Sequence, residues 1–154
     1  MQKEIKINKN NISPDSKTYI IAEIGINHNG KYSLAEKLIV ECAKAGADAV
    51  KFQKRDASSI MIKKNINLNP VGYLSANEKD ISTNQPKYGS WSYPDIRLEL
   101  SEKDYYKLQK VANNEGIDFF ASPWDEKSLD FLIKLKVPLM KIPSVEIKNY
   151  QLLE

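Results

Sequence analysis

At 154 residues, with 42% hydrophobic side chains, the chain is long enough for one globular core, and its composition indicates a single soluble unit. A formal net charge of +3 is too small an excess to favour nucleic acid or a membrane surface as a partner. No apolar run approaches the ~20 residues of a membrane span, and the N-terminal residues lack the apolar core of a signal peptide, so we expect a cytosolic protein.

The N-terminal residues predict a small extension followed by a core strand. Glu4 to Ile7 alternates polar and apolar residues, and residues 10–15 form a turn cluster, so we expect a short strand or hairpin within residues 1–18. Tyr19 to Gly30 is an apolar run that opens into a polar turn, which is typical of a buried strand that ends in a functional loop.

Glu23 is the one carboxylate inside this apolar run. Because burying an unpaired carboxylate costs several kcal/mol or shifts its pKa, we expect Glu23 either to meet a cationic partner or to line a wet cavity. A purely structural ion pair remains the alternative. His28, the single histidine, lies in the following turn, where it is expected to order the loop by hydrogen bonding rather than to bind metal.

The next segment reads as a helix and a second strand. Ser33 to Glu36 matches a capping box, and the apolar residues that follow, including the single cysteine Cys42, have helical spacing up to Ala45. Residues 48–53 alternate as a strand that places Lys51 and Gln53 on one face and its apolar residues on the other. Cys42 is expected to pack as a small hydrophobe.

Residues 54–100 lose this periodicity and predict one very long loop that is rich in Asn, Ser and Lys. Its aromatic segment, Tyr88 to Tyr93, suits either contact with a substrate or a mobile surface insertion.

Two further strand and helix pairs follow the long loop. Ser101 begins a helix that ends at Gly116, residues 117–122 form a third strand, and residues 125–135 form another helix. Residues 138–142 predict a fourth strand and Tyr150 begins a last helical turn. Repeated strand, loop and helix indicate a parallel β-sheet wrapped by helices.

The strand ends favour a (β/α)₈ TIM barrel over a doubly wound sheet. The turn after the first strand does not match the glycine-rich dinucleotide fingerprint of a doubly wound sheet. In a barrel, functional groups lie at the C-terminal ends of the strands. The polar residues of this chain fall at those positions: Glu23, Lys51, Gln53, Ser122, Lys141 and Ser144. Because a full barrel needs about 250 residues, we expect residues 19–154 to form the first half, about four β/α units.

Two lysines, two serines and a glutamate around one centre predict an anionic ligand, because ammonium and hydroxyl groups suit phosphate or carboxylate oxygens. Glu23 and Glu146 are then available for proton transfer or for sugar hydroxyl groups. A Schiff-base aldolase that uses Lys51 or Lys141 as its nucleophile is the competing interpretation.

Four motifs in order resemble the N-terminal half of the sialic acid synthase family, which includes N-acetylneuraminate, legionaminate and pseudaminate synthases. They are Ala22-Glu-Ile-Gly-Ile-Asn-His-Asn-Gly30, Val50-Lys-Phe-Gln53, Ala121-Ser-Pro-Trp-Asp125 and Lys141-Ile-Pro-Ser-Val-Glu146. The resemblance runs from about Tyr19 to the end of the chain.

The resemblance implies a barrel enzyme that condenses phosphoenolpyruvate with the open-chain aldehyde of an N-acylated hexosamine, giving a nonulosonic acid and phosphate. It assigns the holding of phosphoenolpyruvate to Lys51, Ser122, Lys141 and Ser144, and places Glu23 and Glu146 near the reacting carbons. Gln53 and Asn27 would shape the same site. Family members use a divalent metal, usually manganese or magnesium, to polarise the aldehyde, and they form homodimers.

The chain departs from the family pattern in three ways. Many relatives have Ser-Thr-Pro-Phe where this chain has Ala121-Ser-Pro-Trp124, and Gly-Ser-Gly where it has Pro143-Ser-Val145. The paired metal-ligand histidines and the C-terminal antifreeze-like domain of the family have no counterpart here. We therefore expect the opening half of a synthase without its metal ligands; a non-catalytic half-barrel that persists by self-association is a further alternative.

Overall fold

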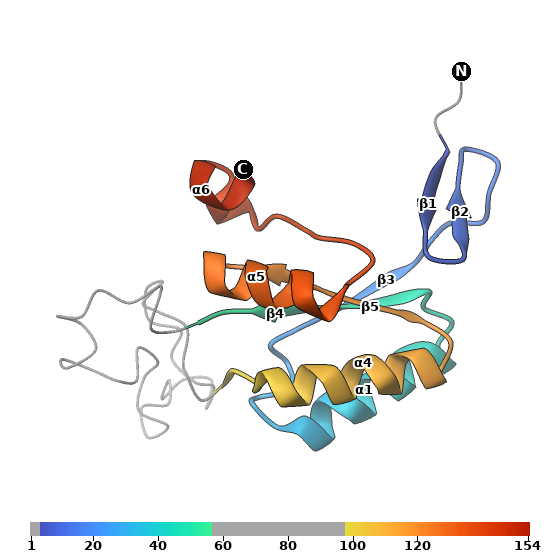
Figure 1. Cartoon of the computed structure of the whole chain (residues 1–154). Coiled ribbons are helices and arrows are strands. Elements are labelled where there is room, and N and C mark those ends of the chain that lie inside the picture. Colours follow the sequence, from blue (N-terminus) through green and yellow to red (C-terminus); the bar gives the residue numbers. More distant parts are fainter. Residues whose placement is uncertain (1–3, 57–97) are drawn as a thin grey trace, which may run out of the picture.

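A three-stranded parallel β-sheet forms the centre of the chain in the computed structural model, which describes residues 4–56 and 98–154 (Figure 1). The strands are β3 (Ile21–Gly25), β4 (Ala49–Lys54) and β5 (Asp118–Pro123), in the order β3-β4-β5. In this register Lys51 of β4 lies opposite Glu23 of β3 and Phe120 of β5. The C-terminal ends of the strands therefore meet at one edge, as the sequence predicts.

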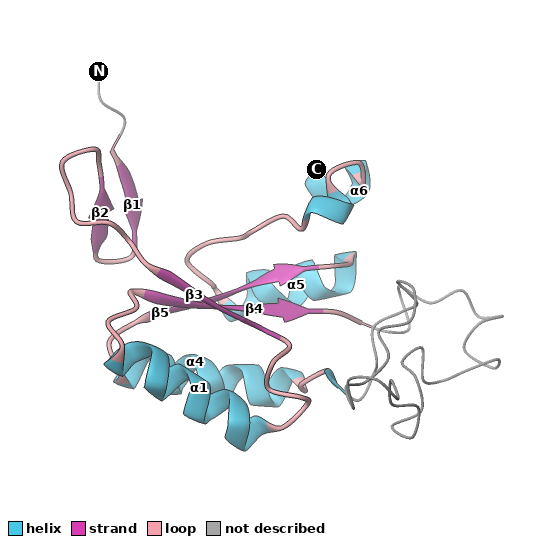
Figure 2. Cartoon of the chain, turned by 180° about the vertical axis from the view of Figure 1, so that it is seen from behind, coloured by secondary structure: helices cyan, strands magenta, loops and turns pink. Residues whose placement is uncertain are grey.

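Helices α1 (Tyr32–Lys44) and α4 (Glu102–Asn114) lie side by side against the sheet, and α5 (Glu126–Leu135) lies along β5 (Figures 1 and 2). The apolar face of the sheet, which includes Val50, Phe52 and Phe119, packs against buried residues of these helices. Tyr105 of α4 meets the rings of Phe119 and Phe131 edge to face at 5.9 and 5.7 Å. This packing directs the polar faces of β3 and β4 away from the helices.

The predicted helix after the long loop is confirmed, including its cap. Ser101 accepts a hydrogen bond from the Asp104 backbone N–H at 3.2 Å, which satisfies a free amide at the start of α4. Asp125 caps α5 in the same way through the Ser128 N–H at 2.8 Å. The short helix α6 (Tyr150–Leu153) is also present, with Asn149 as its cap.

The predicted capping box at Ser33 is wrong. Helix α1 begins at Tyr32, and its N-cap residue, Lys31, which lies two positions before Ser33, makes no side-chain cap. The Lys31 carbonyl already accepts hydrogen bonds from the Leu34 and Ala35 N–H groups, because the turn from His28 brings the chain into helical geometry before Ser33. The predicted end at Ala45 is confirmed.

The predicted fourth strand does not form an extended ladder in the part of the chain that the structure describes. Met140 makes a single parallel bridge to Ala121 of β5. Pro138 and Pro143 flank this segment and lack the N–H groups that a longer ladder needs, which gives a physical reason for its shortness. Lys141 therefore follows one bridging residue rather than a full strand.

The N-terminal residues form a separate antiparallel hairpin, β1 (Ile5–Ile7) and β2 (Asn10–Ile12). Its turn lies at residues 8–9, whereas the sequence placed it within 10–15. The hairpin is fastened to the N-terminal end of β5 at Asp118, which accepts hydrogen bonds from Asn8 Nδ2 at 2.6 Å and Asn10 Nδ2 at 3.1 Å. The Tyr19 hydroxyl donates a third, at 2.5 Å.

Most of the predicted loop 54–100 lies outside the described residues, so its proposed contact segment at Tyr88 to Tyr93 stays a prediction. Within the described ranges, no helix is both long enough and apolar enough to cross a bilayer.

Candidate functional site

A cavity of about 200 Å³ opens at the C-terminal ends of β3, β4 and β5. Six of the eight residues predicted for the site line it, contributed by three strands and by the segment after Met140. The full lining is Glu23, Lys51, Gln53, Ser122, Trp124, Lys141, Pro143, Ser144 and Val145. The structure therefore brings together side chains that are up to 122 positions apart in the sequence, from Glu23 to Val145.

Lys51 is the central cation of the cavity. It is only 8% exposed, its ammonium forms an ion pair with the Glu23 carboxylate, and its Nζ donates a hydrogen bond to Ser122 Oγ at 3.4 Å. A buried ammonium is costly unless it is paired and hydrogen-bonded, and these two partners supply both kinds of contact. The side chain is thus held pointing at the cavity.

Glu23 is more exposed than the sequence suggested. The apolar run around it predicted a buried carboxylate, but its side chain is 50% exposed, because β3 is the outer strand of the sheet and Glu23 faces the open cavity. Its cationic partner and its place on a cavity wall are both present.

A left-handed backbone at Gly25 makes room for the polar groups beside it. Gly25 has φ of +55°, and it follows a register shift between β3 and β4. A Cβ atom at this position would lie 3.4 Å from Gln53 Nε2 and 3.4 Å from Glu23 Oε1. Glycine at this position therefore serves the backbone conformation, and an added Cβ would come into contact with two cavity side chains.

Lys141 and Ser144 reach the cavity from the segment that follows the Met140 bridge. Ser144 begins a single 3₁₀ turn, η2 (Ser144–Glu146), after Pro143. Pro143 and Val145 line the wall on either side of Ser144.

The other two predicted residues, Asn27 and Glu146, are not among the lining residues. Asn27 is exposed in the turn after β3, where its backbone N–H donates to the Ile24 carbonyl at 3.0 Å. The Glu146 carboxylate accepts a hydrogen bond from Asn149 Nδ2 at 2.8 Å, beside the cap of α6. The structure does not bring these two side chains to the cavity.

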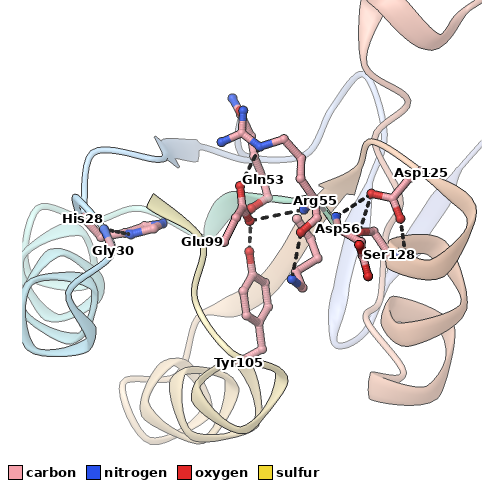
Figure 3. A network of polar contacts seen from close by, with 10 residues as sticks. His28, Gly30, Gln53, Arg55, Asp56, Glu99, Tyr105, Asp125 and Ser128 are labelled. Carbon is pink, nitrogen blue, oxygen red and sulfur yellow. Dashed lines mark hydrogen bonds and ion pairs between the residues drawn. The ribbon is translucent and has the colours of Figure 1, made fainter. Parts of the chain in front are cut away.

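His28 orders its own loop, as the sequence predicts. Its Nδ1 accepts a hydrogen bond from the Gly30 N–H at 3.1 Å (Figure 3). Its ring also stacks on Phe52, with centroids 5.8 Å apart. Burial, and then the positive charge of Arg55, lower the pKa of His28 to about 4. The ring is therefore neutral at physiological pH.

A buried polar network behind the cavity escaped the sequence analysis (Figure 3). Arg55 Nε donates to Glu99 Oε1 at 2.7 Å, and the Tyr105 hydroxyl donates to the Gln53 carbonyl at 2.6 Å. Trp124, which lines the cavity, packs against the Arg55 guanidinium. In the sequence, only the positions of these residues point to the site: Arg55 directly follows β4, and Trp124 lies two residues after Ser122.

The divalent metal that the family resemblance implies does not fit the described residues. Among residues 4–56 and 98–154, no three His, Cys, Asp or Glu side chains gather in a way that would hold a metal ion. The Nδ1 atom of His28 accepts from the Gly30 amide, and its buried Nε2 has no hydrogen-bond partner among the described residues, but His28 belongs to no such group of three.

Comparison with known proteins decides the family. The sequence model of the NeuB family matches residues 38–154. The chain belongs to the NeuB family. The resemblance to sialic acid synthases inferred from the four motifs is thereby confirmed.

Several relatives of this NeuB-family chain are named as synthases. It is 41% identical over 136 residues to the N,N'-diacetyllegionaminic acid synthase of Legionella pneumophila, covering 88% of this chain and 35% of that protein. It is 35% identical over 140 residues to the human N-acetylneuraminate-9-phosphate synthase, again covering 88% and 35%. The chain therefore spans about a third of the length of these curated relatives.

A solved structure has the same fold. The N-acetylneuraminic acid synthetase of Leptospira borgpetersenii, crystallised in complex with citrate, superposes with a TM-score of 0.75 at 28% identity, over 99% of this chain and 45% of that one. The mixed α/β fold with a parallel sheet thus matches that of a sialic acid synthase.

Proposed function

We propose that this chain carries the phosphoenolpyruvate-binding part of a synthase that condenses phosphoenolpyruvate with the open-chain aldehyde of an N-acylated hexosamine, such as N-acetylmannosamine. The products would be a nonulosonic (sialic) acid and phosphate. The proposal rests on one observation: Lys51, Lys141, Ser122 and Ser144 line the same cavity. Membership of the NeuB family supports it.

The charges of the cavity suit a small, highly charged acid. Its lining holds two ammonium groups against one carboxylate, that of Glu23, so the cavity carries a net positive charge. Ammonium groups bind phosphate and carboxylate oxygens as point charges, and the two serine hydroxyl groups add directional donors. A cavity of about 200 Å³ leaves room for a small acid.

We assign roles residue by residue on the family likeness. Lys51, Ser122, Lys141 and Ser144 hold the phosphate and carboxylate, and Gln53 shapes the wall beside Glu23. Glu23 stands next to the bound acid, where it orients the aldehyde or water or transfers a proton. We assign Glu146 and Asn27 to the hexosamine side, which Glu146 would reach only after leaving Asn149.

The architecture of the whole protein belongs to the same proposal. We assign residues 1–18 to an N-terminal extension and residues 19–154 to the first half of a (β/α)₈ barrel, which the strand order and the added bridge at Met140 support. A homodimer and a divalent metal, manganese or magnesium, with ligands outside the described residues, rest on the family likeness alone, and a cytosolic location is part of the same proposal.

The proposal is tested by calorimetric titration of the chain with phosphoenolpyruvate. We expect saturable binding, which weakens at least tenfold in Lys51→Met and in Lys141→Met, because each substitution removes one of two cations that face a polyanion. Lys134→Met, on the exposed side of α5, is the matched control and leaves the affinity unchanged. Equal affinity in all four proteins, or no binding by the parent chain, would refute the proposal.

A second experiment tests the competing interpretation, that the protein is a Schiff-base aldolase. Treatment with borohydride in the presence of pyruvate would attach the keto acid covalently to Lys51 or Lys141 if either formed an imine. We expect no added mass by intact mass spectrometry, since Lys51 is engaged as an ion-paired ammonium.

A further inference from the structure

The cavity wall at Trp124 has a buried cation behind it. Arg55 is only 6% exposed, and its guanidinium carbon lies 5.3 Å from the centre of the Trp124 ring. Trp124 itself lines the cavity. Tryptophan is the aromatic side chain that a stacked guanidinium binds best, which favours this contact.

Arg55 is fixed in place by Glu99. Its Nε donates to Glu99 Oε1 at 2.7 Å, and its backbone N–H donates to Glu99 Oε2 at 3.3 Å (Figure 3). Both side chains are buried, with 7% and 11% of their surfaces exposed. Because removing one partner would leave an uncompensated buried charge, the pair has little freedom to separate.

The backbone on either side of the Trp124 ring is also fixed. Its N–H donates to the Lys54 carbonyl at 3.1 Å, and the carboxylate of the next residue, Asp125, accepts from the Asp56 N–H at 2.7 Å. These contacts tie the ends of β4 and β5 together. With the backbone fixed, the orientation of the Trp124 ring depends on the torsions of its side chain.

The contact with the Arg55 guanidinium restrains those torsions. Within the described residues, Trp124 Nε1 and Arg55 Nη2 are buried and make no hydrogen bond, so no directional bond of the indole orients the ring. The contact that the structure gives for the Trp124 ring is the Arg55 guanidinium.

We propose that Arg55, held by Glu99, is a positioning residue that fixes the Trp124 indole as one wall of the cavity and so sets the space left for the three-carbon acid. The inference rests on the proposed function for the identity of that acid. It assigns to the Arg55–Glu99 pair a part in substrate binding although neither residue lines the cavity.

The orientation of Trp124 can be measured directly. The chain has two tryptophans, so in a Trp91→Phe background the fluorescence anisotropy and acrylamide quenching report on Trp124 alone. We expect Arg55→Met and Glu99→Gln to lower the anisotropy and increase quenching. The affinity for phosphoenolpyruvate, measured by calorimetry, falls about fivefold, which corresponds to one stacking contact of about 1 kcal/mol. Arg55→Lys, which keeps the charge, restores part of both signals.

Lys54→Met is the matched control. Lys54 is the neighbouring buried cation, it also stacks on an aromatic ring, that of Tyr105 at 5.7 Å, and its ammonium donates to the Arg55 carbonyl at 3.1 Å. A structural loss alone would appear in this variant as well. We expect it to lower the melting temperature while leaving Trp124 anisotropy and phosphoenolpyruvate affinity unchanged.

The outcomes are separable. If the parent chain does not bind phosphoenolpyruvate, the proposed function fails, while the anisotropy still decides whether Arg55 holds Trp124. If the parent chain binds but Arg55→Met and Glu99→Gln change neither signal, the inference is overturned. Should Arg55→Met not fold, the double-mutant cycle of Arg55→Lys with Trp124→Phe replaces it: coupled effects on affinity support the inference, and additive effects overturn it.

Discussion

The carboxylate of Glu23 lies against the ammonium of Lys51, directly across the β3–β4 pair and at the entrance to the cavity. The two residues are partners in the sheet register, so the contact follows from the strand pairing itself. An anionic ligand entering the cavity therefore meets a cation that a carboxylate already neutralises in part.

Replacing Glu23 with glutamine is expected to strengthen the binding of phosphoenolpyruvate. The substitution keeps the shape of the side chain and removes the negative charge beside Lys51, which raises the affinity about threefold to tenfold at low salt, less at high salt. Calorimetry at two ionic strengths measures the change. Glu41→Gln, which breaks the Glu41–Lys44 pair on α1, is the control and has no effect on affinity. Weaker binding by Glu23→Gln would show that Glu23 acts mainly by holding Lys51 in place.

Alanine at Gly25 is expected to damage both the fold and the cavity. The backbone there has φ of +55°, and the added Cβ meets Gln53 and Glu23 at 3.4 Å. We expect a loss of about 1–2 kcal/mol in the free energy of unfolding and weaker phosphoenolpyruvate binding. Gly46→Ala is a matched control, because Gly46 has φ of +88° but its added Cβ would meet nothing within 4 Å. It should lose stability by a similar amount with unchanged affinity; a parallel loss of affinity in both would point to a global effect.

Acid is expected to destabilise the fold through His28. Its folded-state pKa is lowered to about 4, so between pH 6.5 and 4 the unfolded chain takes up a proton that the folded chain does not. Stability is therefore present above pH 6.5 and is lost as the pH falls, by about 2 kcal/mol between pH 7 and pH 5. Urea unfolding at several pH values measures the slope.

The matched comparison for this slope is His28→Asn, whose amide oxygen replaces Nδ1 as an acceptor for the Gly30 N–H. His28 is the single histidine, so the variant should lose the slope. Burial raises the pKa of Glu99, so the contribution of Glu99 to the free energy of unfolding has the opposite sign: it decreases as the pH rises above the ordinary pKa of a glutamate. This contribution is the same in both proteins. An equal slope in both proteins would exclude His28 as its source.

Replacing Asp118 with asparagine is expected to release the N-terminal hairpin without affecting the cavity. The carboxylate accepts from Asn8, Asn10 and the Tyr19 hydroxyl, and an amide nitrogen there would face donors, so we expect a loss of about 2–3 kcal/mol. Hydrogen exchange should increase at residues 5–12 more than in β4. Asp130→Asn, on the exposed side of α5, is the control. A fall in phosphoenolpyruvate affinity in Asp118→Asn would contradict the separation of the two ends of the sheet.

The periodic parts of the sequence predicted the periodic parts of the fold. The strands at Glu23, Lys51 and Ser122 and the helices capped by Ser101 and Asp125 follow from alternation, helical spacing and capping residues, all of which act over a few positions. Because parallel strands align their C-terminal ends, placing polar residues at those ends was enough to gather six of them on one cavity.

Features set by distant contacts could not be predicted in this way. The Arg55–Glu99 pair joins residues 44 positions apart, and no local pattern connects them. The exposure of Glu23 depends on which strand lies at the outer edge of the sheet, whereas the apolar run gives only the strand. The position of Glu146 depends on Asn149, whose side chain also caps the next helix.

The middle position of β4 has a consequence for how tightly a ligand can be held. Both edges of this strand are hydrogen-bonded, to β3 and to β5, so Lys51 and Gln53 project from a stretch of backbone that has few alternative conformations to give up. A ligand that meets such groups loses little free energy in ordering its receptor, and most of the contact energy can appear as affinity.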